Sequence, residues 1–194
     1  DNFVPNDTNS VPMHERVELD CWIISELQTL IETVTEHYEN FEPHRAARAI
    51  ENFVDEHLSN WYVRLSRRRF WTQRSSAENG EISKDKQAAY ETLHECLFVV
   101  AQLMSPIAPF FADWLYHNLT TPQSEKRNSN QMRFESVHLT ELLKANRSAQ
   151  NKDLEERMEL AQKIASMVLS IRKKENIRVR QPLQRIQIPI IDPA

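Results

Sequence analysis

Glycine is almost absent from this sequence, with one residue in 194. Tight β-hairpin turns and phosphate-binding loops both rely on glycine, because its backbone reaches positive φ without steric cost. A shortage of this size argues against a sheet-rich fold and against a nucleotide-binding loop. The composition therefore predicts an all-α protein whose turns use proline, asparagine and serine.

Cysteine is also scarce, and the two residues present, Cys21 and Cys96, lie far apart in the chain. Without a Cys-x-x-Cys spacing, the sequence predicts neither a disulfide framework nor a zinc site. We expect both thiols to be reduced packing groups in a cytoplasmic protein. The chain also lacks an apolar run of about 18 residues and a signal peptide, so no membrane association is predicted.

Catalytic motifs are missing as well. The seven histidines are scattered, and neither a His-Glu-x-x-His motif nor a nucleophile elbow occurs. We therefore expect a monomer that binds or braces something and that has no catalytic centre, metal or cofactor of its own. Because the net charge is −4, any polyanion must be bound by a local basic patch and not by the overall charge of the chain.

Apolar residues recur at spacings of three and four along most of the chain, which is the pattern of amphipathic helices. An antiparallel bundle of about five helices is the expected fold. Ser83 is a suitable N-cap for the third helix. The helices are predicted over residues 19–39, 43–71, 83–104, 106–119 and 152–175.

Two details of this bundle are predicted from local composition. Ser59 and Asn60 disfavour a helix interior and indicate a bend in the second helix. The fourth helix is the most apolar segment, with Phe110, Phe111 and Trp114 close together, and it is predicted to be the central helix.

The ends of the chain differ from this helical body. Residues 1–16 are rich in proline and asparagine, so they are interpreted as a linker from an upstream domain. The helical domain is predicted over residues 17–180. Isoleucines alternate with other residues over 186–190, which predicts a strand within 181–194, at the start of a truncated further subdomain. Since a strand needs a partner, it is expected to pair beyond residue 194 or with residues 134–139.

Residues 59–71 combine four large aromatic residues with four arginines in an acidic protein. Projection on a helix gathers Leu58, Trp61, Tyr62 and Leu65 on a core-facing side. Arg69 falls on this apolar side, so either the helix ends before it or a buried acidic partner holds it. The opposite side carries Arg64, Arg67, Arg68 and Trp71.

A second basic cluster follows the last helix. Lys173 and Lys174 suit a helix C-terminus through the helix dipole alone, but Arg178 and Arg180 extend the positive charge beyond it. Both clusters can be explained as solvated or ion-paired surface, or as a surface for a polyanion or for another domain.

Four segments, residues 19–27, 41–54, 58–71 and 177–183, resemble the anticodon-binding helical domain of class Ia aminoacyl-tRNA synthetases. The first begins Leu19-Asp20-Cys21-Trp22-Ile23-Ile24-Ser25, and the last contains Arg180-Gln181-Pro182-Leu183. The third, with its Asn-Trp-Tyr-Val-Arg start and its Arg-Arg-Arg-Phe-Trp end, is most similar to isoleucyl-tRNA synthetases. It looks like the eukaryotic and archaeal branch of that family, which some bacteria also possess.

The resemblance implies a parent ligase that uses ATP and Mg²⁺ to join isoleucine to tRNA(Ile), with the chemistry in a catalytic domain outside these residues. This chain would supply tRNA binding and contact that catalytic domain. Candidate tRNA contacts are Arg64, Arg67, Arg68, Arg74, Trp71, Lys173, Lys174, Arg178 and Arg180. The alternatives are docking of the 59–71 run on the catalytic domain, a helical protein-interaction scaffold, or the same domain of a valine enzyme.

Overall fold

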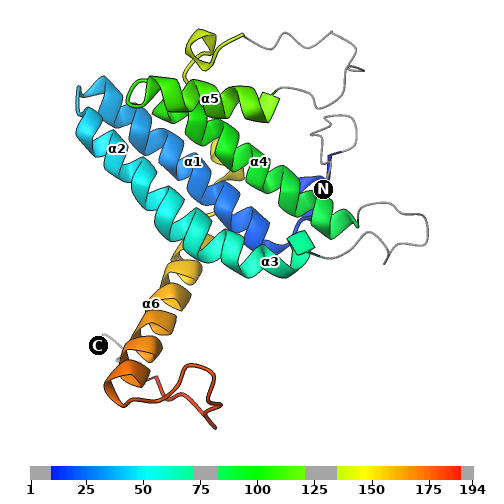
Figure 1. Cartoon of the computed structure of the whole chain (residues 1–194), viewed down its shortest axis with the longest axis vertical. Helices are drawn as coiled ribbons and strands as arrows, with labels where there is room; N and C mark the ends of the chain where they lie inside the picture. The colour runs from blue at the N-terminus through cyan, green and yellow to red at the C-terminus, as the bar shows by residue number, and fades with distance from the viewer. Residues whose placement is uncertain (1–9, 72–82, 121–134, 189–194) are drawn as a thin grey trace. The chain divides into compact units, whose positions relative to one another are not determined.

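The structure is a computed structural model that describes residues 10–71, 83–120 and 135–188 (Figure 1). All regular elements of this described part are helical, which agrees with the predicted all-α class. The chain divides into two compact units, residues 1–152 and 153–194. The elements of the first unit are η2 (Met13–Glu15), α1 (Glu18–Glu39), α2 (Pro43–Asn52), η3 (Phe53–Val63), α3 (Arg64–Trp71), α4 (Lys84–Met104), α5 (Pro109–Thr120), η5 (Val137–Leu139) and η6 (Arg147–Ala149).

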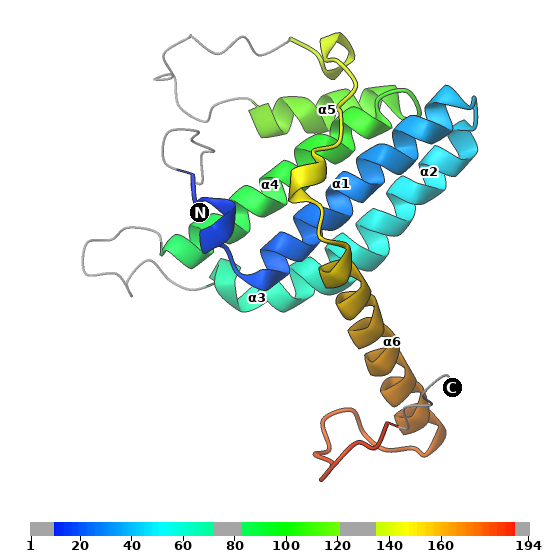
Figure 2. The same ribbon diagram turned by 180° about the vertical axis from the view of Figure 1, so that it is seen from behind.

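Helix α1 is the centre of the first unit. It lies between α2 and α4 and also contacts η3 (Figures 1 and 2). Its side chains Trp22, Ile23, Leu27 and Val34 are at most 1% exposed. Burying large apolar side chains of this kind stabilises a fold by roughly 1.5–3 kcal/mol each, so α1 supplies much of the core's stability.

Helix α5 is not the central helix, and the prediction from its apolar composition was wrong. It packs on α4 through Ala112 and Tyr116, whereas Phe110 is 91% exposed and Trp114 is 60% exposed. The reason is that apolar content shows what a helix is able to bury but not which surface its neighbours cover. The small Ala112 lets α5 approach α4 closely, and the bulky aromatic residues around it are left outside.

The second predicted helix changes its type along its length. It begins as α2, with Pro43 in the first turn, where a missing N–H costs nothing. From Phe53 to Val63 it is a π-helix, η3, and it returns to α-helical geometry in α3. The disturbance predicted at Ser59 and Asn60 is therefore a widening of the helix and not an interruption.

The π-helix rotates the side chains away from their α-helical positions, because each wide turn holds more residues. Phe53, Leu58 and Tyr62 face the core, at spacings of five and four. Leu65, which the α-helical projection assigned to the core side, is 52% exposed. That assignment was wrong, and the wider turns are the cause.

The ends of the helices are closed by local hydrogen bonds. The Ser83 side chain accepts a hydrogen bond from the Lys86 N–H, which confirms Ser83 as the N-cap of α4. After α1, Phe41 has a φ of 57°, and the N–H groups of Phe41 and Glu42 donate to the carbonyls of Tyr38 and His37. Glycine is the usual residue in this left-handed position, and a residue with a Cβ costs about 1–2 kcal/mol there.

The segment after α5 is fastened to the first unit by specific contacts. Asp113 on α5 accepts hydrogen bonds from the Ser136 hydroxyl at 2.6 Å and from the Val137 N–H at 3.1 Å. The Ser136 hydrogen bond is the main reason why the pKa of Asp113 is lowered. Farther along, the Asn146 N–H donates to Gln28 and the Asn151 N–H to Ser25, so the segment runs across α1 (Figure 2).

The second unit contains most of α6 (Lys152–Lys174) and the residues that follow it. Asn176 ends the helix with a φ of 55°, and the Arg172 guanidinium donates to the carbonyls of Arg178 and Gln181 at 2.8 and 3.0 Å. These bonds fold the tail back onto the end of its own helix.

The predicted strand is not found in the described residues. Residues 182–188 have no regular secondary structure, and residues 189–194 lie outside the described part. The expected pairing segment is also different, because Val137–Leu139 forms the 3-10 turn η5. Without a partner among the described residues, alternation alone does not make a strand. The predicted domain limits, 17–180 and 181–194, stay a prediction.

Candidate nucleic-acid interface

A buried carboxylate organises the region where α1, η3, α3 and α4 meet. Asp20, in the first turn of α1, is 0% exposed. Arg69 on α3 donates to it twice, from Nη1 to Oδ1 and from Nη2 to Oδ2, each at 2.7 Å. The Tyr62 hydroxyl of η3 donates to Asp20 Oδ1 at 2.8 Å. A buried charge needs such a set of partners, since an unpaired one is very costly.

Arg69 is therefore a structural residue that ties α3 to two other helices. Its Nε donates to Asp85 Oδ1 at 2.9 Å, and its Nη2 donates to the Asp85 carbonyl at 3.1 Å. Burial opposes the charge on Arg69, but the hydrogen bonds and charges of Asp20 and Asp85 outweigh burial and raise its pKa. Of the two alternatives predicted for Arg69, the buried acidic partner is therefore the one found, and the helix continues past it to Trp71.

The Tyr62 hydroxyl, on η3, is the third member of this hydrogen-bond network. It lies 2.8 Å from the Asp20 carboxylate and 3.2 Å from the Ala89 carbonyl, and the side chain is fully buried. Burial first, and then the Asp20 charge, raise the pKa of Tyr62. The phenol therefore stays protonated and remains a hydrogen-bond donor.

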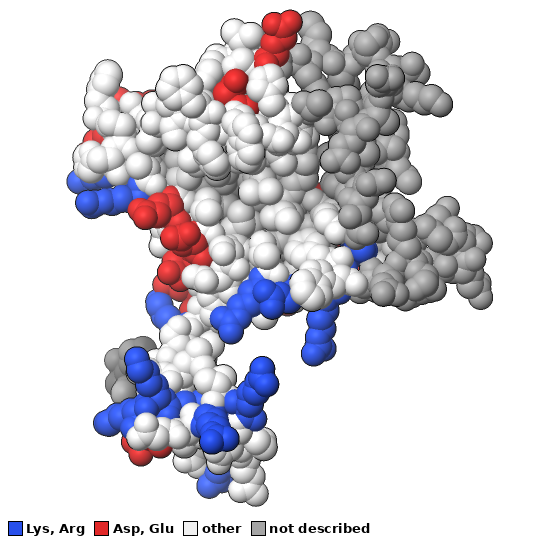
Figure 3. All heavy atoms as spheres, viewed as in Figure 1, with Lys and Arg blue, Asp and Glu red and all other residues white. Residues whose placement is uncertain are grey.

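The other arginines of α3 occupy its exposed side. Arg64, Arg67 and Arg68 are exposed, and the Arg67 guanidinium lies 5.7 Å from the centre of the Trp71 ring. Trp71 itself is 76% exposed. In the space-filling view, basic side chains follow α3 along the edge of the first unit (Figure 3). We call Arg64, Arg67, Arg68 and Trp71 the α3 surface.

The remaining sequence-predicted contacts lie elsewhere. Arg74 is outside the described residues. In the second unit, Lys173, Lys174, Arg178 and Arg180 are exposed around the C-terminal end of α6. The structure thus gathers two groups of the predicted residues, each on its own unit.

A pocket that the sequence did not indicate lies at the other end of α1. It has a volume of about 420 Å³ and is lined by Tyr38 from α1, by Gln102 from α4, by Ser105 and Pro106 from the turn after α4, and by Thr140, Glu141 and Leu142. Gln102 is 7% exposed, and its Oε1 has no hydrogen-bond partner in the described part of the chain. A buried polar atom without a partner needs an explanation, such as a water molecule or a ligand.

No sequence pattern marks Gln102, because it sits in an amphipathic helix where a single polar residue is ordinary. The sequence reasoning named Phe41 only as the first residue of the family-like segment 41–54 and did not predict its left-handed backbone, although the sequence offers one indication of it. The chain turns sharply between Asn40 and Pro43 without a glycine, so a residue with a side chain had to take the left-handed position.

Among the described residues, every helix is either too short or too polar to cross a lipid bilayer. Within the same residues, no cluster of three or more histidine, cysteine, aspartate or glutamate side chains is arranged to hold a metal ion.

Comparison with known proteins gives this geometry a context. The family model described as the anticodon-binding domain of tRNA ligase matches residues 20–188. The isoleucine–tRNA ligase of Cytophaga hutchinsonii is 49% identical over 193 residues, which covers 100% of this chain and 16% of that protein. The corresponding ligase of Bacteroides thetaiotaomicron is 50% identical over 182 residues, covering 94% of this chain and 14% of that protein. The isoleucine–tRNA ligase of Thermus thermophilus is 37% identical over 179 residues, which covers 92% of this chain and 16% of that protein.

Proposed function

Because the chain belongs to the family of anticodon-binding domains of tRNA ligases, we propose that it is the tRNA-binding part of an isoleucine–tRNA ligase. The chain spans 16% of the length of its Cytophaga relative, so the activity of the whole enzyme is part of the proposal. In this proposal, ATP and Mg²⁺ act in a catalytic domain of the whole enzyme, outside these residues. The whole ligase is proposed to work in the cytoplasm. The substrate bound by this chain is tRNA(Ile), and this chain itself is monomeric.

The observation that carries this proposal is that the arginines of α3 occupy two different environments. Arg69 is held by Asp20 and Asp85 inside the fold, whereas Arg64, Arg67 and Arg68 are exposed on the α3 surface. Guanidinium groups bind phosphate oxygens with paired hydrogen bonds, and such contacts position a nucleic acid without reading its sequence. We therefore assign the α3 surface to the tRNA backbone, with Trp71 available for stacking.

The second basic cluster has a parallel role in this proposal. Lys173, Lys174, Arg178 and Arg180 project from the end of α6 in the second unit, where they are exposed. Their charges exceed what the helix dipole requires, because two of the four lie beyond the end of the helix. We assign these four residues to further phosphates. Arg74, which follows the 59–71 run in the sequence, is assigned to the same role.

The test uses the full-length ligase with both Arg67 and Arg68 changed to glutamate. The KM for tRNA is expected to rise, while the rate of isoleucyl-adenylate formation, which needs no tRNA, is unchanged. Arg147→Glu is a control for charge reversal, because Arg147 is an exposed arginine of the same unit that lies on η6 and pairs with Glu32 of α1. An unchanged KM for tRNA would remove the α3 surface from the interface.

A second function for the same surface is docking on the catalytic domain. The exposed apolar groups support it, since Trp71 is 76% exposed and Leu65 is 52% exposed. Under this alternative, Leu65→Ser and the double arginine variant both lower adenylate formation. The two functions therefore differ in which half-reaction responds.

A further inference from the structure

Arg172 holds the chain that follows α6 through one nitrogen atom of its guanidinium. Its Nη1 donates hydrogen bonds to the carbonyls of Arg178 at 2.8 Å, Gln181 at 3.0 Å and Val179 at 3.4 Å. Three carbonyls from four consecutive residues therefore converge on one side chain. Hydrogen bonds from a charged donor are roughly twice as strong as neutral ones, so this contact orders the segment.

The segment held in this way is a β-turn over residues 178–181. The Gln181 N–H donates to the Arg178 carbonyl at 3.0 Å, which is the bond that closes such a turn. All four residues are described, and none of them has a positive φ, as in the common type I turn. One closing bond is a small return for fixing the backbone of four residues. The bonds from Arg172 provide the additional stabilisation.

The end of α6 directs the chain toward this turn. Asn176 has a φ of 55°, a left-handed conformation that asparagine tolerates. The Ile177 N–H then donates to the Arg172 carbonyl at 2.8 Å. Arg172 therefore contacts the returning chain twice, once with its backbone and once with its side chain.

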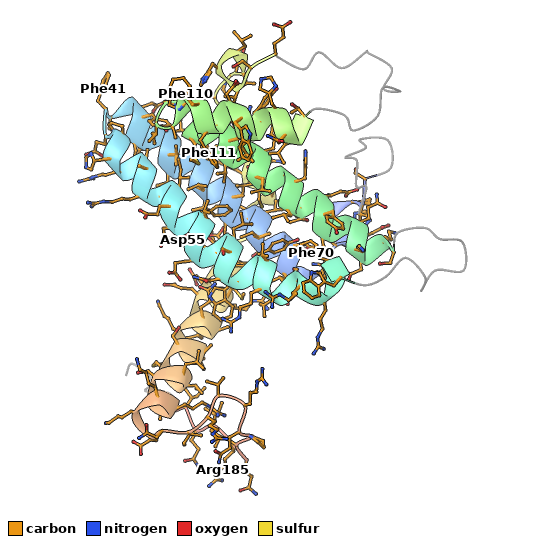
Figure 4. The ribbon with its side chains drawn as sticks, in the orientation of Figure 1. Phe41, Asp55, Phe70, Phe110, Phe111 and Arg185 are labelled. Carbon is orange, nitrogen blue, oxygen red and sulfur yellow. The ribbon has the colours of Figure 1, made fainter. Side chains whose placement is uncertain are left out.

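The turn carries two of the basic residues that we assign to phosphates. Arg178 is its first residue and Arg180 is its third, and all four residues of the turn are exposed. Burial therefore does not hold the turn in place, and the hydrogen bonds from Arg172 do. Figure 3 shows basic side chains gathered around this end of α6, and Figure 4 shows the chain returning beside the helix, with Arg185 farther along it.

The helix dipole explains the charge of Arg172 but not the direction of its side chain. A cation in the last turn of a helix is favourable through the dipole alone. The Arg172 side chain, however, reaches carbonyls that lie six to nine residues ahead of it in the sequence. Ordering a segment before it binds reduces the conformational entropy that binding removes. Such ordering raises affinity without any contact to the ligand.

We propose that Arg172 is a positioning residue for tRNA binding, which holds the 178–181 turn so that Arg178 and Arg180 face the phosphate backbone together. Arg172 itself does not contact the tRNA. The inference rests on the proposed function, because it takes Arg178 and Arg180 to be phosphate contacts. It adds that their affinity depends on a third arginine whose hydrogen bonds are made within the chain.

The first test is Arg172→Met in the full-length ligase, which keeps an unbranched side chain and removes its donors. The KM for tRNA(Ile) is expected to rise about ten-fold, because two arginines must now be ordered on binding. The kcat and the rate of adenylate formation are expected to stay unchanged. Lys163→Met is the matched control, since it removes a cation of the same helix that pairs with Glu159. An unchanged KM for Arg172→Met would show that the turn needs no positioning.

Hydrogen exchange separates local ordering from a general loss of structure. Exchange in the peptide of residues 177–185 is expected to be faster in free Arg172→Met ligase than in wild type, because the turn opens more often. Peptides from α1 and α4 are expected to exchange at wild-type rates. Wild-type exchange in the 177–185 peptide would contradict the proposal, whatever happens to the KM.

A double-mutant cycle tests whether the effect of Arg172 passes through the turn. In a ligase that carries both Arg178→Gln and Arg180→Gln, Arg172→Met is expected to cause little further loss of tRNA binding, because no guanidinium remains for the turn to present. Additive losses would show that Arg172 binds tRNA independently. A decrease of about one in the slope of log K against log salt for Arg172→Met alone would also reject the proposal, since it indicates a lost phosphate contact.

Failure of the inference is distinguishable from failure of the proposed function. If the Arg178 and Arg180 variants leave tRNA binding unchanged, the assignment of this cluster to phosphates is wrong and the inference fails with it. If they weaken binding but Arg172→Met does not, the tRNA-binding role stands and only the positioning role is wrong. If Arg172→Met lowers adenylate formation and leaves the KM for tRNA unchanged, the turn contacts a protein segment, which also excludes the positioning role.

Discussion

Arg69 and Asp20 meet through two parallel hydrogen bonds of 2.7 Å, although 49 residues separate them in sequence. The paired geometry joins the end of α3 to the beginning of α1, and Asp85 adds α4 to the same guanidinium. One consequence is that three neighbouring arginines are left on the outer side of α3. The core ion pair therefore orients the surface that we assign to tRNA.

Removing one partner of this ion pair is expected to cost more than removing both. Asp20→Ala removes the buried partner of Arg69 and leaves only the half-exposed Asp85 to pair with it, so the free energy of unfolding should fall by up to about 3–5 kcal/mol. Combining it with Arg69→Met should restore part of this loss, because the double variant no longer buries a guanidinium that lacks its buried carboxylate. Urea denaturation of the two single variants and the double variant measures this coupling. Additive losses would show that the two residues do not interact.

The π-helical register of η3 predicts different costs for two leucines that an α-helix would place on one face. Leu58 is 3% exposed, so Leu58→Ala should lower the free energy of unfolding by about 2–5 kcal/mol. Leu65 is 52% exposed, and Leu65→Ala should change the same quantity by no more than about 0.5 kcal/mol. Thermal or urea unfolding measures both. Equal losses would favour a continuous α-helix.

Tyr38 predicts a loss of stability in alkaline solution. Its burial raises the pKa of Tyr38 to about 12, compared with an ordinary value of about 10. Because the folded protein favours the neutral phenol, its contribution to stability is fully present below pH 10 and is lost as the pH rises through about 12. Absorbance of tyrosinate during a pH titration follows this ionisation.

The control for that titration is Tyr38→Phe, which should remove one ionisation from the high-pH end of the curve. The same variant leaves the Leu103 carbonyl without the hydroxyl that donates to it at 2.7 Å. A loss of about 1 kcal/mol in unfolding free energy at neutral pH is expected. A Tyr38 that ionises at its ordinary pKa would contradict the burial seen at the end of α1.

Salt dependence offers a measure of the phosphate contacts on the α3 surface. Each arginine that binds a phosphate displaces bound counterions, so changing Arg67 and Arg68 to glutamine should reduce the slope of log K against log salt concentration by about 1–2. Arg147→Gln, at an exposed arginine outside the α3 surface, should leave that slope unchanged. Measuring the tRNA binding constant over a series of salt concentrations gives these slopes. Equal slopes for wild type and the arginine variant would exclude phosphate contacts by these two residues.

The sequence by itself determined the helical class, the approximate ends of the helices, the N-cap at Ser83 and the family. These features depend on local spacing and on residue types, which a single segment contains. It also showed that Arg69 needed an acidic partner if it lay within the helix, because burial of an unpaired charge is costly whatever the fold.

Only the tertiary structure decided which residue that partner is, because Asp20 belongs to a distant helix. It also decided that α5 lies at the edge of the first unit with Phe110 exposed, and that a π-helical stretch turns Leu65 away from the core. The pocket at Gln102 arises from three segments that are far apart in sequence. Local patterns specify what a segment is able to bury, whereas the packing of distant segments decides what it does bury.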